Sequence, residues 1–398
     1  MADNNENKVL NVPHLRFPEF SGEWKKCKLG DLCNVLMCKR ILVSQTNTED
    51  GVPFYKIGTI GSTPDAYISK ELFDDYKVKY NYPRKGEVMI TCAGTVGKCV
   101  VYDGEDAYFQ DSNIVWIDNP TQYISNGFLF HLLSKVDWRK LNSTTIIRIY
   151  NDDLRNLKMS YPRKEEQQKI SHLLSLLDER IATQNKIIED LKKLKSAIIE
   201  KTFNENYSNK IRLRDVGSYI RGLTYSSDDV VESNGIFVMR SNNIINGSSL
   251  DYHNNIVSVN KQILTEQQLQ TGDIVICMAN GSSSLVGKSS FYDGDCSTPI
   301  TVGAFCGIYR SKEPIVKWLF QTNKYRRYIW NSLQGGNGAI ANLNGDDILR
   351  MSFSIPATPA KDNRIKLLTS VDTLLESNIS LCDLYISQKL YLLRQMFI

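Results

Sequence analysis

Two glycine–lysine pairs in the sequence have the composition of a phosphate-binding turn. Gly97-Lys98 lies in "VGKCVVYDG" (96–104), and Gly287-Lys288 lies in the related stretch "VGKSSFYDG" (286–294). A Walker A loop needs the spacing G-x-x-x-x-G-K-[ST], because only then do its backbone N–H groups surround the phosphates. The first copy has too few residues between its glycines, and the second has one too many. We therefore predict a tight turn between two strands at each place, and no nucleotide loop.

Motifs for other enzymatic chemistry are also missing from the sequence. The stretch nearest to a DNA methyltransferase tetrapeptide, "NPTQ" (119–122), lacks the second proline and the aromatic residue. The four histidines are scattered and the nine cysteines form no C-x-x-C pair, which indicates neither a zinc site nor a hydrolase. We expect a non-catalytic binding protein that holds no metal or cofactor. Its thiols should be reduced, as in a cytoplasmic protein.

Polar and basic residues in predicted turns favour DNA as the ligand. Arginine reads guanine and asparagine reads adenine through paired hydrogen bonds, whereas lysine and arginine also neutralise phosphates. The same residue types are common in ordinary turns and on solvated faces. The candidates in the first half are Lys56, Thr59, Lys98, Arg139 and Lys140, and those in the second half are Arg240, Asn242, Asn243, Asn280, Ser282, Ser283, Ser284, Lys288, Arg326, Arg327 and Asn337.

The sequence segments that must position these residues occur twice in the chain. "KLGDL" (28–32) recurs as "RLRDV" (212–216), and "NDDLRNLKMSYP" (151–162) recurs as "GDDILRMSFSIP" (345–356). A period of about 190 residues corresponds to a whole module. Each copy contains short runs of β-branched and aromatic residues between turns, then a short helix, a strand that ends in proline, and a long helix. We therefore predict an α+β protein with two homologous β-rich domains.

Each copy ends in a long stretch with the pattern of a helix, 164–203 in the first copy and 362–396 in the second. Apolar residues follow a 3.5-residue repeat in both stretches, which is typical of a coiled coil. Gln184 and Lys195 fill two skipped positions of the first repeat. The predicted seam consists of Ile170, Leu174, Leu177, Ile181, Ile188, Leu191, Ile198, Leu368, Val371, Leu375, Ile379, Cys382, Ile386 and Leu393.

The two long helices are expected to pair with each other, since a lone exposed helix with this pattern would be unstable. Connectivity makes the pair antiparallel and returns the last residues to the first module. The molecule would then be pseudo-two-fold and near-circular. The alternative is that each long helix packs only on its own module. The predicted boundaries are 1–163 and 206–360 for the two β-rich domains and 164–205 and 361–398 for the two helices.

The overall composition agrees with a globular protein. Hydrophobic residues make up 42% and charged residues 23% of the 398 residues, and the formal net charge is +4. This charge permits nucleic-acid binding without requiring it. No apolar run approaches the 18 residues of a membrane span, and the polar N-terminus lacks the apolar region of a secretory signal. We expect a cytoplasmic protein.

The sequence resembles the specificity subunit of type I restriction-modification systems. The resemblance rests on "VPHLRFPEFSGEWKKCKLGDL" (12–32), "PRKEEQQKISHLLSLLDERI" (162–181), "LKKLKSAIIEKTF" (191–203) and the order of modules and helices. It implies that each β-rich domain is a target-recognition domain for one half of a split DNA site. It also implies that the helices set the spacing and dock two methyltransferase subunits. Restriction subunits would join this complex, and S-adenosylmethionine and ATP would bind to the partner subunits.

The resemblance assigns no base-contacting residue, because residues 236–310 differ from residues 54–118 except at framework positions. Two other hypotheses stay open from the sequence. One is a nuclease or methyltransferase with degenerate motifs. The other is a coiled-coil scaffold whose β modules bind proteins.

Overall fold

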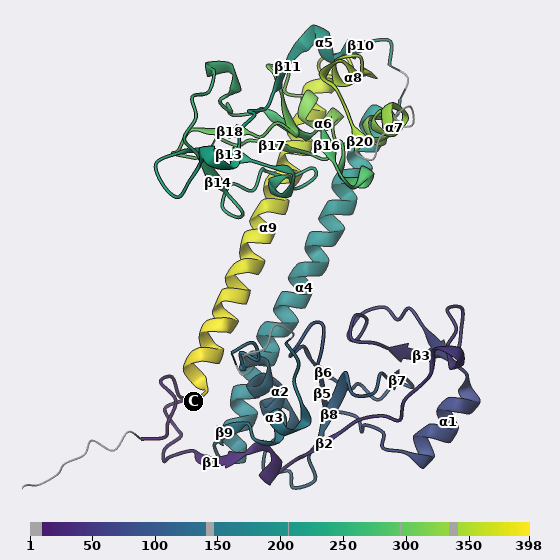
Figure 1. Cartoon of the computed structure of the whole chain (residues 1–398), viewed down its shortest axis with the longest axis vertical. Helices are drawn as coiled ribbons and strands as arrows, with labels where there is room; N and C mark the ends of the chain where they lie inside the picture. The colour runs from purple at the N-terminus through teal and green to yellow at the C-terminus, as the bar shows by residue number, and fades with distance from the viewer. Residues whose placement is uncertain (1–9, 141–146, 206, 295, 334–340) are drawn as a thin grey trace, which may run out of the picture. The chain divides into compact units, whose positions relative to one another are not determined.

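The structure is a computed structural model that describes residues 10–140, 147–205, 207–294, 296–333 and 341–398 (Figure 1). The chain divides into two compact units, which we describe separately. Unit 1 comprises Met1–Asn185 and Ser380–Ile398, and unit 2 comprises Lys186–Ile379. Each unit therefore contains one β-rich part and a portion of both long helices, whereas the predicted boundaries treated each helix as a segment of its own.

The β-rich part of unit 1 is built around a four-stranded antiparallel sheet of order β2-β8-β5-β6. A second sheet, β4-β3-β7, contains the parallel pair β3–β7, and β1 pairs with β9. Strand β5 is buried along its whole length, as a central strand covered on both faces should be. The elements are β1 (Lys25–Lys28), β2 (Asn34–Leu36), β3 (Val52–Tyr55), β4 (Tyr67–Ile68), α1 (Lys70–Lys79), β5 (Val88–Thr91), β6 (Cys99–Val101), β7 (Tyr108–Phe109), β8 (Ile114–Asp118), α2 (Asn126–Lys135), α3 (Asn151–Arg155) and β9 (Lys158–Tyr161).

The β-rich part of unit 2 contains two four-stranded sheets, of order β11-β19-β15-β17 and β12-β14-β13-β18, and the two-stranded sheets β10-β21 and β16-β20. Its elements are β10 (Lys210–Arg212), α5 (Leu213–Val216), β11 (Gly217–Arg221), β12 (Val230–Val231), β13 (Ile236–Met239), β14 (Val257–Val259), β15 (Ile274–Cys277), β16 (Ala279–Asn280), β17 (Ser289–Phe291), β18 (Ile300–Val302), β19 (Cys306–Ser311), α6 (Val316–Leu319), α7 (Asn323–Leu333), β20 (Ala341–Asn342), α8 (Gly345–Leu349) and β21 (Ser352–Ser354).

The two β-rich parts share one topology. Strands β11, β19, β15 and β17 take the places of β2, β8, β5 and β6 in the order of the sheet. The antiparallel pair β10–β21 corresponds to β1–β9, and the parallel pair β13–β18 corresponds to β3–β7. The strand orders therefore confirm the α+β fold with a duplicated β-rich module.

The repeated glycine–lysine stretches form the hairpin turns that the sequence predicts. Gly97 lies between β5 and β6, Gly287 lies between β15 and β17, and both have φ +82°. An added Cβ would collide with the side chain of Trp138 at the first turn and with that of Ile329 at the second. Only glycine combines this backbone conformation with so close an approach, so the two glycines are framework residues of the module.

The core of unit 1 includes the last residues of the chain. Leu393, Met396 and Phe397 are buried together with Trp24 and Phe128. The Phe397 ring lies 4.8 Å from the ring of Phe128 and 6.4 Å from that of Trp24, measured between centroids. The C-terminal segment thus returns to the first module, as the connectivity argument predicts.

The long helices are α4 (Lys164–Phe203) and α9 (Ala360–Met396). Within unit 1, Asp178 pairs with Lys389, and Asn185 accepts a hydrogen bond from the Cys382 thiol at 3.5 Å. Seven residues forward along α4 therefore correspond to seven residues backward along α9, so the two helices run antiparallel in this unit. The pseudo-two-fold, near-circular arrangement of the whole chain stays a prediction.

Burial along α4 and α9 follows the predicted seam with one exception. The predicted seam residues are buried or half-buried, and Gln184 and Lys195 are each 6% exposed. Ile386 is wrong as a seam residue, since its side chain is 40% exposed. Tyr385 is half-buried in its stead and lies 6.0 Å from the guanidinium of Arg180. The buried position is therefore shifted by one residue here, to an aromatic ring that makes a cation–π contact with Arg180.

Candidate nucleic-acid interface

Two predicted DNA-reading loops of unit 2 lie in contact with each other. The loop after β13 contains Arg240, Ser241 and Asn242, and β16 ends at Asn280. The amide of Asn280 donates a hydrogen bond to the hydroxyl of Ser241 at 3.3 Å. The parallel pairing of β13 with β18 and the position of β15 bring these strand ends to one edge of the module.

The equivalent loops of unit 1 also meet. The ammonium of Lys98, in the turn before β6, donates a hydrogen bond of 2.5 Å to the carbonyl of Ile60, in the turn after β3. Lys56 in that turn pairs with Asp65 at 2.9 Å, and the Thr59 hydroxyl accepts from the backbone N–H of Lys56 at 3.0 Å. Unit 1 therefore presents fewer unengaged side chains at this edge than unit 2.

Arg240 and Asn242 are the most available of the base-reading candidates in unit 2. Both side chains are exposed, and Arg240 makes one hydrogen bond of 3.3 Å to the carbonyl of Asn255. The Asn242 amide has no hydrogen bond to another residue in the described part of the chain. These side chains offer the donor and acceptor groups that recognise guanine and adenine edges.

Asn243 is a structural residue and does not face the solvent. Its side chain is 0% exposed. The amide donates to the carbonyls of Asp251 (3.0 Å) and Asn254 (2.7 Å), and its oxygen accepts from the backbone N–H of Arg240 (2.9 Å). Every hydrogen-bonding group we expected to read a base is therefore used to hold the loop that presents Asn242.

The serine turn of unit 2 is exposed. Ser282, Ser283 and Ser284 are all at the surface, and the hydroxyls of Ser282 and Ser284 lie 2.8 Å apart. The Asn280 side-chain oxygen accepts from the backbone N–H of Ser282 at 3.0 Å. Asn280 thus orients this turn as well as touching Ser241.

The basic candidates differ between the units. In unit 1, Arg139 and Lys140 are exposed after α2, and Lys140 pairs with Asp137 at 3.3 Å. In unit 2, Arg326 and Arg327 are exposed on α7. Arg326 and half-buried Lys288 line one hollow of about 240 Å³ with exposed Trp330. Lys98 and Lys288 hold equivalent places in the sequence, but within the described part of the chain only Lys98 of the two donates to a carbonyl. Asn337 lies outside the described residues.

Phe305 is a surface residue of the same edge that the sequence reasoning missed. Its side chain is 69% exposed in the turn between β18 and β19. Its carbonyl accepts hydrogen bonds from the backbone N–H groups of Met278 (2.8 Å) and Ala279 (3.1 Å), which fixes it beside the strand that leads to Asn280. A phenylalanine in a glycine-containing turn between two apolar strands was the signal that could have identified it.

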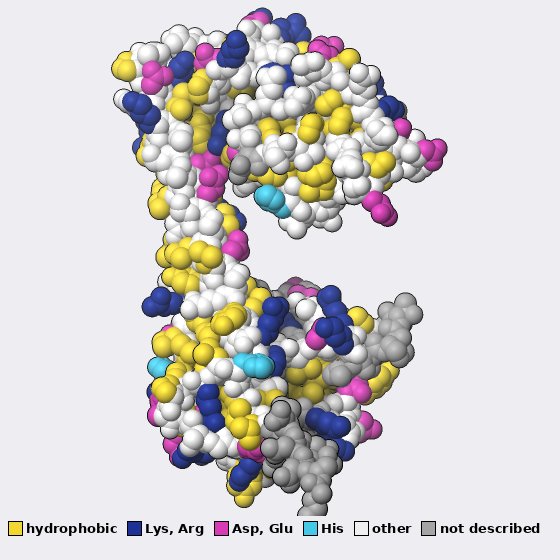
Figure 2. All heavy atoms as spheres, turned by 90° about the vertical axis from the view of Figure 1, so that its left-hand side faces the viewer, with side chains coloured by type: hydrophobic (Ala, Val, Ile, Leu, Met, Phe, Trp, Pro, Cys, Tyr) yellow, Lys and Arg dark blue, Asp and Glu magenta, His cyan; other side chains and the backbone are white. Residues whose placement is uncertain are grey.

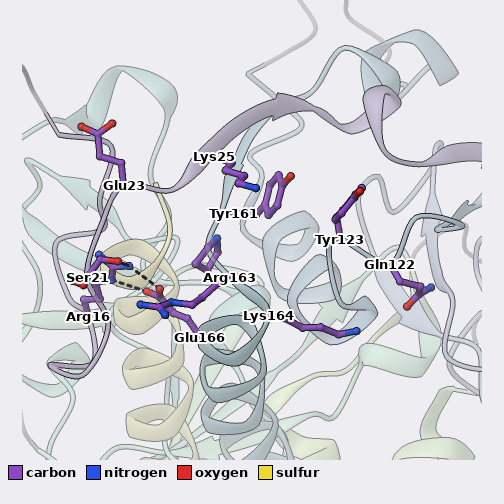
Figure 3. Close-up of a pocket in the computed structure, with 11 residues that line it drawn as sticks. Arg16, Ser21, Glu23, Lys25, Gln122, Tyr123, Tyr161, Arg163, Lys164 and Glu166 are labelled. Carbon is purple, nitrogen blue, oxygen red and sulfur yellow. Dashed lines mark hydrogen bonds and ion pairs between the residues drawn. The ribbon is translucent and has the colours of Figure 1, made fainter.

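A pocket beside the first turn of α4 is lined by residues that pair with each other (Figure 3). Arg16 points toward Glu166, and two bonds of 2.7 Å join the guanidinium to the carboxylate. The indole N–H of Trp24 donates to the same carboxylate at 3.2 Å, and Glu166 is 0% exposed. This network fastens the N-terminal segment to the helix, and we interpret it as structural.

The described residues contain no group of three or more side chains suited to a metal ion. The nine cysteines are free thiols in the structure, and burial raises the pKa of the Cys92 thiol to about 12. Among the described helices, none combines the length and the apolar character needed to cross a membrane.

The whole chain has the fold of a type I specificity subunit. It superposes on the crystal structure of the type I restriction-modification S subunit from M. genitalium with a TM-score of 0.59. The sequence identity is 15%, and the alignment covers 97% of this chain and 99% of that one. At this level of identity the likeness concerns the fold alone.

The first half of the sequence matches a known family model. Residues 21–193 match the model of the type I restriction modification DNA specificity domain. The match confirms the resemblance to type I specificity subunits that the sequence indicates.

Curated relatives agree with this assignment. A Haemophilus influenzae protein provisionally named a type I restriction enzyme specificity subunit is 46% identical over 184 residues, which are 46% of this chain and 45% of that protein. The type I restriction enzyme EcoKI specificity subunit of Escherichia coli is 34% identical over 173 residues, 40% of this chain and 34% of that protein. The alignments thus span less than half the length of these relatives.

Proposed function

We propose that the chain is the non-catalytic DNA sequence-specificity subunit of a type I restriction-modification complex. The observation that carries this proposal is one topology used twice, with different polar loops at equivalent strand ends. A duplicated framework with divergent loops suits two modules that each read a different half of a split DNA site. Arg240, Asn242 and Asn280 would read bases in unit 2, whereas Lys56 and Thr59 lie at the equivalent edge of unit 1.

The proposed complex acts in the cytoplasm and supplies the chemistry through its other subunits. Two methyltransferase subunits would bind S-adenosylmethionine, and restriction subunits would bind ATP. Helices α4 and α9 would fix the distance between half-sites, because the length of a rigid helix sets the separation of whatever it connects. The experiment for this point is to delete one heptad from both helices, which should shorten the spacer of the methylated motif.

Exposed apolar side chains on the long helices support docking of the methyltransferase subunits there (Figure 2). In unit 2, Leu194 and Leu374 are 49% and 51% exposed, and in unit 1, Leu384 and Tyr391 are 66% and 58% exposed. Leu384 and Tyr391 are seven residues apart on α9, a spacing that keeps them on one side of the helix. Such apolar surface is usually covered by a partner.

The introduction of a charge tests the docking surface. Leu374→Glu should abolish co-purification of the methyltransferase subunit and leave duplex binding unchanged, because the loops of the module are not altered. The matched control is Leu264→Glu, which changes another exposed leucine (62% exposed) outside the long helices. Equal co-purification of the two variants would contradict docking at this surface.

The purified chain alone tests the absence of catalysis. We expect salt-dependent binding to duplex DNA, and neither cleavage nor methyl transfer when magnesium and S-adenosylmethionine are added. Methyl transfer or cleavage by the chain alone would favour the enzyme hypothesis. Binding to proteins without salt-dependent binding to DNA would favour the scaffold hypothesis.

A further inference from the structure

The basic side chains of helix α7 in unit 2 extend beyond the recognition loops. Arg326 lines the hollow that contains Lys288 of the glycine–lysine turn. The next residue, Arg327, points to a different side of the helix, because successive residues are rotated by about 100°. Lys324 lies one turn before Arg327 on the same face. The basic residues of this helix therefore continue from the loop edge across α7.

The row of cations reaches strand β10. The ammonium of Lys324 lies 5.6 Å from the ring of Phe353, and Phe353 pairs with Ile211 in the β10–β21 sheet. The Tyr328 hydroxyl of α7 donates to the carbonyl of Ser352 at 3.1 Å, so α7 packs beside this sheet. Lys210, the first residue of β10, is exposed next to it. We call Arg327, Lys324 and Lys210 the α7–β10 track.

The track is not neutralised within the protein. None of its three residues forms an ion pair with another residue in the described part of the chain. Burial lowers the pKa of the half-buried Lys324 ammonium, and the neighbouring charges of Lys210 and Arg327 lower it further. Like charges gathered without a carboxylate repel one another, so the arrangement costs stability unless an external anion is bound.

Along β10, a buried apolar residue alternates with exposed charged residues. Ile211 is 7% exposed in the core, whereas Lys210 and Arg212 on either side are exposed. Strand β1 repeats the pattern in unit 1, with exposed Lys26 and Lys28 around half-buried Cys27. Lysines on an edge strand also discourage aggregation. That role does not explain why Arg327, which is on a helix, joins the same cluster.

We propose that the α7–β10 track binds the phosphate backbone of the DNA that adjoins the half-site read by unit 2. The inference rests on the proposed function and deepens it, since it adds a sequence-independent contact to the base-reading loops. Phosphate contacts position a protein on the duplex without reading its sequence. The track therefore contributes affinity and salt dependence, whereas Arg240 and Asn242 contribute preference for one sequence.

The double variant Lys210→Gln/Arg327→Gln of the full chain tests the track. We expect the slope of log affinity against log salt to fall in magnitude by about two, because each phosphate contact contributes about 0.9. The affinity should fall by the same factor for duplexes with and without the split site. Lys210→Arg/Arg327→Lys should restore both quantities, since either cation can bind a phosphate. The control Lys312→Gln/Lys366→Gln removes the same charge from two other exposed lysines and should change neither.

Three results would overturn the track. One is an unchanged slope and affinity in the double variant. Another is a loss confined to the duplex that contains the split site, which would assign Lys210 and Arg327 to base reading. The third is normal duplex binding with loss of the methyltransferase subunit, which would make the track a protein contact. A parent chain without salt-dependent duplex binding would instead overturn the proposed function itself, and the track with it.

Discussion

Lys195 and Asp372 form a buried ion pair between α4 and α9 in unit 2, with an N···O distance of 2.5 Å and 7% exposure of each side chain. In unit 1, Lys389 and Asp178 form the corresponding pair. Asp178 and Asp372 stand 194 positions apart, and so do Lys195 and Lys389. The internal duplication of the chain is therefore seen in the contacts between the two helices as well as in the sheets.

Removal of the Asp372 charge should destabilise unit 2 strongly. Asp372 accepts from Lys195 and also from Lys317 at 2.7 Å, so Asp372→Asn leaves two cations without their counter-ion. Breaking a buried pair from one side costs about 3–5 kcal/mol. Urea unfolding of the full chain measures this loss. Asp178→Asn, which alters a pair with 35% and 19% exposure, should cost only about 1 kcal/mol. Equal losses in the two variants would refute the assigned difference in burial.

His131 should make unit 1 sensitive to acid. The pKa of this imidazole is lowered to about 4, mainly by burial; Asp178 opposes the shift and Lys389 adds to it. Below about pH 6.5 His131 therefore binds a proton in the unfolded chain but not in the folded unit. The free energy of unfolding falls as the pH falls from about 6.5 to 4.

His131→Leu removes this contribution. The free energy of unfolding of the parent should drop by about 2 kcal/mol more than that of the variant between pH 7 and pH 5. Urea unfolding at the two pH values measures the difference. The control His172→Leu changes an exposed histidine of α4 and should retain the pH dependence of the parent. Identical pH profiles of parent and His131→Leu would count against a buried neutral imidazole.

Gly97 should tolerate no side chain. Gly97→Ala combines φ +82° with a collision against Trp138, and we expect a loss of about 2–4 kcal/mol in the free energy of unfolding. Thermal unfolding of the full chain checks the change. Gly58→Ala in the same module meets no atom within 4 Å and should cost little. A Gly97→Ala protein as stable as Gly58→Ala would show that the hairpin turn is not the framework element described above.

Asn242 and Asn243 should respond to substitution in opposite ways. Asn242→Ala should leave stability unchanged and weaken discrimination of one base pair by about 1–3 kcal/mol in competition binding. Asn243→Ala leaves buried backbone groups without partners and should lower stability by about 2 kcal/mol. If Asn242→Ala retained the full preference for the split site, Asn242 would not read a base.

The sequence was sufficient to predict the fold because its signals were repetitive. Pro162 followed by acidic residues placed the start of α4 at Lys164, and the structure begins the helix there. The 3.5-residue repeat identified the buried face of both helices, including the place of Lys195. It did not reveal that Asp372 is the partner of Lys195, because the two residues are 177 positions apart in the chain and their pairing depends on the register between the two helices.

The candidate interface was less predictable, because neighbouring residues of one type have different environments. Asn242 and Asn243 are indistinguishable by turn propensity, yet one is exposed and the other is wholly buried. Exposure of Phe305 depends on the strand pairing around β18 and β19, which no local pattern specifies. Composition therefore indicates which loops are rich in polar residues but not which side chain within each loop is exposed.

Methylation sequencing of the genome in cells with and without this gene tests the central claim most directly. We predict that loss of the gene removes methylation from one split motif, made of two half-sites separated by a spacer of fixed length. Unchanged methylation, or the loss of a continuous motif without a spacer, would contradict the assignment of one half-site to each module.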